Sequence, residues 1–341
     1  LPDLMLLRNR INSRAAFIVG AGPSLAENGR LLSEVGPKGF IICAAAALKP
    51  LLSLGVSPDI ILVLESSDTS SYLTLNEVER QILKNEVVLA AASGSHPNHF
   101  KVDGFIKAIF HLNGGEAQLL GRGLFLPQGG NAGTAAFALA YVWGMSPLIL
   151  VGQDQAYHGQ LLHAPGTVDN VSEIDRATVV TIPAIGGGFA ETNTSLLASI
   201  NWYAEAANSI KRKSVQPKLI NSTFRGAALK GFEEISLDEV LRNLGPEPNP
   251  ISLKAMLSAL PKPSAKEIRG DLRQMSALVS SLKSVLQVNF QRCINEMMNA
   301  SKASAFLAHI LAPALASGHR AGALKNLIWA DGIILKMLAS L

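Results

Sequence analysis

Short apolar runs alternate with helix-like stretches through the first two thirds of the chain. Residues 15–19 and 40–44 are apolar runs followed by helix-like residues, and an amphipathic stretch precedes the run at 87–91. Runs that are apolar without alternation indicate strands buried on both faces, as in parallel sheets covered by helices. The other expected strands are 60–64, 108–112, 148–151 and one within 218–223. We therefore expect an α/β fold with a Rossmann-like, doubly wound and mainly parallel sheet.

Two stretches, 132–144 and 192–213, have the apolar spacing of helices, and residues 155–188 between them have an irregular pattern. Three prolines lie close together in "LGPEPNPIS", which marks a boundary. Beyond this boundary the periodicity is helical, without a strand pattern. We expect a catalytic α/β domain over residues 1–246 and a C-terminal all-α domain over residues 247–341.

The composition is that of a globular protein, with 48% hydrophobic and 16% charged residues. A net charge of +4 suits a small anionic ligand but is too small to indicate nucleic-acid binding. The segment 123–153 has no charged residue, yet Gly144 and Pro147 divide it into a helix and a strand, so we expect no membrane span. Cys43 and Cys293 have apolar neighbours and no metal-ligand spacing, which predicts a reducing, cytoplasmic compartment.

A glycine turn, "GAGPSL", joins the first expected strand to a helix-like segment. Gly20 and Gly22 allow backbone N–H groups to approach an anion at a helix N-terminus. The dinucleotide pattern needs a third glycine where Leu25 stands, and the P-loop lysine is absent. Pro23 and Ser24 favour a rigid helix start with Ser24 as its cap. The turn is either an anion site or an ordinary tight connection. A second glycine cluster, "QGGNAG", opens the helix expected at 132–144 and is another candidate cradle for a phosphate or ribose.

Polar side chains follow several expected strands. Asp154 follows one strand, with His158 and His163 in the loop beyond it, whereas Glu65 and Asn221 lie at the ends of two other strands. The carboxyl ends of parallel strands converge on one crevice, where doubly wound sheets bind ligands. Histidines beside a carboxylate favour acid–base chemistry, although each of these residues also has a purely structural interpretation as a cap, turn or surface group.

The order of these motifs resembles the Maf family, the motility-associated factors of bacteria. These are flagellin glycosyltransferases that act with nonulosonic acids such as pseudaminic or legionaminic acid. The resemblance rests on "GAGPSL", "GVSPDIILVLE", "GGNAGTAAFALAYVWGMSPLILVGQDQAYHG" and "INST", covers roughly residues 1–244, and extends to the helical tail. The same core is similar to bacterial sialyltransferases, which use CMP-activated sugars, and to archaeal 6-hydroxymethylpterin diphosphokinases.

The resemblance implies a donor site for a CMP-activated nonulosonic acid, with no tightly bound cofactor and no metal ligand. It implies that His158 or His163 is the general base, since an imidazole pKa of ~6.5 suits neutral pH, and that Asp154 lies near the sugar or positions the loop. The nucleotide-binding residues that it implies are Gly20, Gly22, Pro23, Ser24, Glu65, Gly130, Asn131, Gly133, Thr134 and Asn221.

The sequence also departs from the related patterns. Ala21, Ala44 and Ala132 stand where the sialyltransferase patterns have polar residues. Phe224 and Arg225 follow "INST", where the Maf pattern continues with an acidic residue and glycine. These departures imply that the donor is held differently or that the activity is changed.

Three functions follow from this pattern. The leading one is transfer of the sugar to Ser or Thr hydroxyls of flagellin, with the helical tail as a candidate surface for the acceptor or for a homo-oligomer. The second is a 6-hydroxymethylpterin diphosphokinase-like transfer from ATP, which needs Mg²⁺ on carboxylates such as Glu65, Asp68 and Asp154. The third is a non-catalytic flagellin-binding module.

Overall fold

A computed structural model describes residues 1–12, 14–112, 125–168, 178–245, 249, 251–261 and 273. The chain forms two compact units, and the first, Leu1–Phe110 with Leu126–Leu260, contains all the helices and strands whose bounds are given below. The second unit, His111–Phe125 with Pro261–Leu341, lies mostly outside the described residues. The helical domain expected over 247–341 also lies mostly outside them and stays a prediction. Its described part includes α8 (Leu253–Ser258), which belongs to the first unit.

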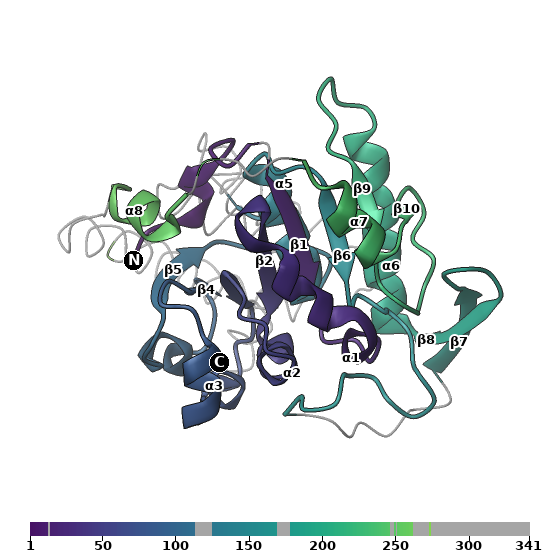
Figure 1. The fold of residues 1–341 in the computed structure, drawn as a ribbon, viewed down its shortest axis with the longest axis horizontal. Coiled ribbons are helices and arrows are strands. Elements are labelled where there is room, and N and C mark those ends of the chain that lie inside the picture. The colour runs from purple at the N-terminus through teal and green to yellow at the C-terminus, as the bar shows by residue number, and fades with distance from the viewer. Residues whose placement is uncertain are drawn as a thin grey trace, which may run out of the picture. The chain divides into compact units, whose positions relative to one another are not determined.

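The first unit is built on a sheet of eight strands in the order β10-β9-β6-β1-β2-β3-β4-β5, and every neighbouring pair is parallel (Figure 1). The strands are β1 (Ala15–Val19), β2 (Gly39–Ala44), β3 (Ile60–Val63), β4 (Val88–Ala92), β5 (Ile106–Phe110), β6 (Leu148–Val151), β9 (Leu219–Asn221) and β10 (Glu233–Glu234). The chain proceeds from β1 to β2 on one side, and β6 later pairs with β1 on the other side. This reversal beside β1 is the switch point at which doubly wound sheets open a ligand crevice. The α/β class is therefore confirmed.

Helices cover both faces of this sheet. On one face, Phe17 and Val19 share a buried apolar cluster with residues of α1 (Leu25–Asn28), α2 (Leu48–Ser53) and α7 (Leu237–Asn243). The helix α5 (Ala132–Val142) contacts β1, β2, β3 and β6 but has no residue in that cluster, so it covers the opposite face. The ring of its Phe137 meets that of Tyr203 on α6 (Thr194–Ile210) edge to face, with centroids 5.6 Å apart.

Shorter elements complete the described part of the chain. They are α3 (Glu77–Ile82) and the 3-10 helices at Leu4–Leu7, Gly29–Glu34, Gly36–Lys38, Ala45–Ala47, Ser70–Leu73 and Pro97–Lys101. None of the helices in the described ranges is long and apolar enough to cross a membrane. The charge-free run at 123–153 indeed contains α5 and β6 as separate elements.

The strands β7 (Val179–Pro183) and β8 (Phe189–Asn193) form an antiparallel hairpin. β7 lies within residues 155–188, which were expected to be irregular, so that expectation was wrong for β7, and β8 begins directly after that segment. The turn of the hairpin contains Gly186, Gly187 and Gly188, all with positive φ, a conformation that glycine adopts without the steric penalty of a side chain. The hairpin is anchored beside the end of β6, because the Tyr157 N–H donates to the carbonyl of Glu191 at 2.8 Å.

Candidate functional site

The carboxylate of Asp154 lies at the switch point, just beyond the end of β6, and only 2% of the residue is exposed. Ser24, in the turn after β1, donates to it twice. Its backbone N–H binds Oδ2 at 2.8 Å and its hydroxyl binds Oδ1 at 2.7 Å. A Cβ atom on Gly22 would lie 2.2 Å from Oδ1, so only glycine leaves room for this carboxylate. The glycine turn thus holds a side chain of the protein itself.

The donors of this turn are already used inside the protein. The N–H groups of Gly20 and Gly22 donate to the carbonyls of Val151 and Gly152 at 2.9 and 2.8 Å. The hydroxyl of Ser24 makes no cap on α1, so the expected capping role was wrong and its hydroxyl binds Asp154 instead. Nucleotide binding by Gly20, Gly22, Pro23 and Ser24 stays a prediction, but free N–H groups at these glycines cannot be its basis.

The second glycine cluster builds the start of α5. Asn131 caps this helix, since its side chain accepts the N–H of Thr134 at 2.9 Å. A Cβ atom on Gly133 would lie 2.4 Å from the side-chain oxygen of Gln153, so this glycine lets α5 approach the end of β6. Gly130 has open space around it and a φ of +95°. Their roles in donor binding stay predictions.

His158 lies against the buried carboxylate, with its Nε2 atom 3.3 Å from Oδ2 of Asp154. Burial raises the pKa of Asp154 to about 7, against the opposing effect of the hydrogen bonds from Ser24. Burial, and then the charge of Arg225, lower the pKa of His158, while Glu27 acts in the opposite direction. At neutral pH His158 is therefore an uncharged imidazole, and Asp154 changes its charge in the same pH range.

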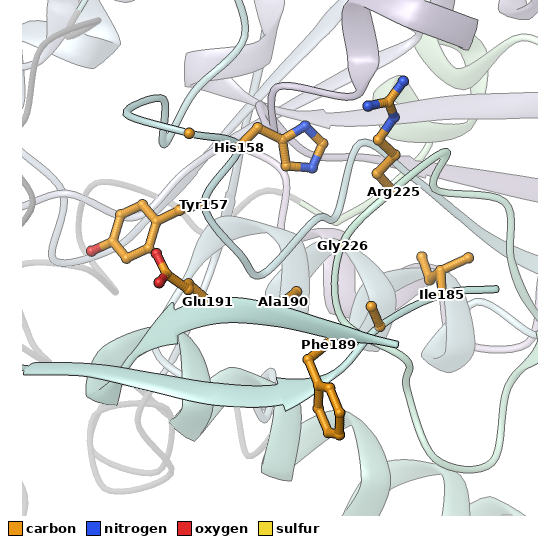
Figure 2. A pocket seen from close by; sticks show the side chains of 10 residues that line it. Tyr157, His158, Ile185, Phe189, Ala190, Glu191, Arg225 and Gly226 are labelled. Carbon is orange, nitrogen blue, oxygen red and sulfur yellow. The ribbon is translucent and has the colours of Figure 1, made fainter. Parts of the chain in front are cut away.

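A pocket of about 550 Å³ opens beside His158 (Figure 2). Its lining includes Tyr157, His158, Ile185, Phe189, Glu191 and Arg225. The segment that follows β9 reaches the pocket at Gly226. The φ of Gly226 is +128°, and a Cβ atom there would lie 2.2 Å from the Asp154 carbonyl oxygen. The N–H of Ala227 also donates to that carbonyl, at 2.8 Å. The pocket thus lies between the loop after β6, the hairpin and the segment after β9.

Arg225 is a functional candidate that stands out in the sequence only as a departure from the Maf pattern. In Figure 2 its guanidinium and the imidazole of His158 lie on the same side of the pocket, opposite β8 with Glu191. Its Nη2 atom is 3.0 Å from Oε2 of Glu27, and its guanidinium carbon lies 5.5 Å from the centroid of the Phe224 ring. The sequence signal was a cation and a glycine, Arg225-Gly226, one residue beyond the polar strand end "INST".

The remaining predicted residues are not among those that line this pocket. His163 belongs to the loop that returns to the glycine turn, where the Ala164 N–H donates to the Ala21 carbonyl at 2.7 Å. Glu65 follows β3, which is separated from β1 by β2 and hence by roughly 10 Å. The side-chain oxygen of Asn221 accepts the N–H of Thr223 at 3.1 Å. Of the predicted set, the structure brings Gly22, Ser24, Asp154 and His158 together.

The carboxylates proposed for Mg²⁺ do not converge. Asp68 accepts hydrogen bonds from the side chains of Ser70 and Asn98, each at 2.6 Å, whereas Asp154 is held by Ser24. Within the described ranges, no group of three or more His, Cys, Asp or Glu side chains is placed to hold a metal ion. The donor set Glu65, Asp68 and Asp154 is therefore not assembled.

The parallel sheet and its switch-point carboxylate define a Rossmann-like core. Two comparisons with known proteins agree with this fold. Residues 2–160 match the model of a family described as 6-hydroxymethylpterin diphosphokinase MptE-like. Among solved structures, the chain is similar to the MAf glycosyltransferase from Magnetospirillum magneticum AMB-1, with a TM-score of 0.57 and 17% sequence identity. The similarity covers 89% of this chain and 46% of that enzyme, and no curated protein matches significantly. Residues 2–160 thus resemble the MptE-like family, and the chain has the fold of the Maf glycosyltransferase, as its motifs implied. It spans less than half the length of that enzyme.

Proposed function

We propose that this chain is a glycosyltransferase that moves a nonulosonic acid from a CMP-activated donor to Ser or Thr hydroxyls of flagellin. The main support is the series Ser24–Asp154–His158 at the switch point of the sheet, in which Ser24 hydrogen-bonds to Asp154, Asp154 contacts His158, and His158 lines the pocket. Two comparisons add support, because the matching family and the similar solved structure both have names that describe group transfer. The pocket is large enough for one sugar unit and its leaving group.

In this proposal His158 is the general base. Its Nε2 atom lies against Asp154, which leaves Nδ1 to take the proton from the acceptor hydroxyl. The acceptor oxygen bonds to the anomeric carbon, the bond from that carbon to the phosphate oxygen breaks, and CMP leaves with the electron pair. The ionised Asp154 orients the ring and stabilises the imidazolium that forms. General base catalysis of this kind contributes about 10²- to 10⁴-fold to the rate.

The test combines the chain with flagellin and with CMP-pseudaminic, CMP-legionaminic or CMP-N-acetylneuraminic acid. Release of CMP and the mass of flagellin are followed for the wild type, His158→Ala and His163→Ala. We expect His158→Ala to slow transfer by about 10²-fold or more while CMP binding persists, and His163→Ala to stay near the wild-type rate. Unchanged transfer by His158→Ala would exclude this base, and no CMP release from any donor would exclude the proposed activity.

A second candidate function is a diphosphokinase, which the family match over residues 2–160 favours. Formation of AMP from ATP and Mg²⁺ in the presence of 6-hydroxymethylpterin would establish it. Binding of CMP without turnover would instead favour the non-catalytic module that binds flagellin.

A further inference from the structure

We propose that Arg225 binds the carboxylate of the acidic sugar in the donor and thereby sets the specificity of the pocket. This proposal rests on the proposed function, since it names the group of that donor which the pocket recognises. It adds a residue that the motif comparison does not supply, because Arg225 stands at a departure from the Maf pattern.

The charges of the pocket favour one position for an anion. Arg225 and Glu191 both line the pocket, on opposite walls (Figure 2). His158 carries no charge at neutral pH because burial and Arg225 lower its pKa. A carboxylate that enters is therefore repelled from the Glu191 wall and attracted to Arg225. The planar guanidinium also presents paired N–H donors that match the two oxygens of a carboxylate.

The present partner of Arg225 is one that a substrate can replace. The Arg225–Glu27 pair has a contact of 3.0 Å, but 62% of the arginine side chain and 33% of the glutamate side chain are exposed. Ion pairs in contact with water contribute little, since both groups are also well solvated when apart. The ring of Phe224 near the guanidinium and the fixed backbone at Gly226 keep the arginine at the pocket while its partner changes.

Binding at this position would also place the reacting atom. In a nonulosonic acid the carboxylate is bonded directly to the anomeric carbon, so a carboxylate on Arg225 holds that carbon on the His158 side of the pocket. The charged groups that face His158 are Asp154, Arg225, Glu27 and, from the opposite wall, Glu191. Burial is the larger cause of the lowered pKa of His158 and the charge of Arg225 is the second, so a carboxylate bound to Arg225 acts only on the second cause.

The test compares Arg225→Gln and Arg225→Lys with the matched control Arg242→Gln, whose arginine is exposed and pairs with Asp238 outside the pocket. The probes are CMP, CMP-N-acetylneuraminic acid, and free N-acetylneuraminic acid with its methyl ester. We expect Arg225→Gln to raise the KM for the CMP-sugar about 10-fold or more and to leave the Kd for CMP within about twofold. The wild type should bind free N-acetylneuraminic acid at least about 10-fold more tightly than its methyl ester, and Arg225→Gln should bind the two equally.

A second readout separates recognition from a structural role. The pKa of His158, followed by NMR titration, should rise in Arg225→Gln, stay low in Arg225→Lys and be unchanged in Arg242→Gln. If Arg225→Gln weakened the binding of CMP and of the CMP-sugar equally, Arg225 would bind the phosphate. If Arg225→Gln still bound the acid more tightly than its ester, as the wild type does, Arg225 would bind neither group. Either result overturns this proposal while the transferase activity of the wild type stands. If the wild type neither binds nor cleaves CMP-sugars, the proposed function itself fails, and this inference fails with it.

Discussion

Replacing Asp154 with Asn should stabilise the protein at alkaline pH while impairing its chemistry. The amide preserves the local contacts, because its oxygen can accept the Ser24 N–H and its nitrogen can donate to the Ser24 hydroxyl. What the substitution removes is a carboxylate that is only 2% exposed. Burial opposes ionisation of this group, so the charged form is the one that destabilises the folded state.

The sign and size of this stability difference follow from the pKa of Asp154, which rises from 3.8 to about 7 on folding. Between these values the folded state binds more protons than the unfolded state, so wild-type stability falls as pH rises through this window. Each pKa unit corresponds to about 1.4 kcal/mol, so the whole window amounts to roughly 4 kcal/mol as an upper estimate. Because Asp154→Asn lacks this dependence, the amount by which its free energy of unfolding exceeds that of the wild type should grow from pH 4 and level off above pH 7.

Thermal unfolding at pH 4.5, 6, 7 and 8 measures this difference, and about 2–4 °C in Tm is expected for each kcal/mol. Transfer should fall at least 10-fold, because a neutral amide stabilises the imidazolium of His158 poorly. Asp68→Asn is the matched control. Hydrogen bonds from Ser70 and Asn98 lower the pKa of Asp68, so its removal should destabilise the protein above pH 4. A Tm difference for Asp154→Asn that is constant with pH, or a destabilisation at pH 8, would refute the reasoning.

Two further substitutions test the glycine turn. Ser24→Ala removes a hydrogen bond that lowers the pKa of Asp154, so the acid limb of the pH–rate profile should move to higher pH. An acid limb that does not move would mean that ionisation of Asp154 does not control the catalytic step. Gly22→Ala places a Cβ atom 2.2 Å from Oδ1 of Asp154 and should lower the free energy of unfolding by about 1–3 kcal/mol, measured by urea denaturation. Gly94→Ala, with open space at its Cβ position, is its control, and equal losses in both would contradict the packing argument.

The central strands could be predicted because parallel strands that are buried on both faces are apolar throughout. Both β1 and β6 coincide with the expected runs, whereas β5, at the sheet edge, begins and ends two residues earlier than expected. The hairpin β7–β8 could not be predicted in this way. Most of its side chains are at least partly exposed, and Phe189 at its turn is 79% exposed, so burial leaves no regular apolar pattern.

The candidate site was predictable only in part. Asp154 and His158 could be proposed because residues that follow parallel strands meet at one edge of the sheet. The hydrogen bonds between Ser24 and Asp154 could not be predicted from the sequence, because 130 positions separate the two residues. A glycine turn also has the same sequence pattern whether it surrounds a phosphate or a side-chain carboxylate. Arg225 was missed because its place depends on how Gly226 packs against the Asp154 carbonyl, which no motif encodes.

The pairing of β1 with β6 has a consequence for synthesis of the protein. About 130 residues separate the end of β1 from the start of β6, so ribosomes making 5–20 residues per second need roughly 6–26 s to supply its second partner. During that interval the apolar β1 is an open sheet edge, which is a template for pairing with another chain. Nascent chains that end before β6 should therefore aggregate, and the candidate site can form only after β6 and then β9 have joined the sheet.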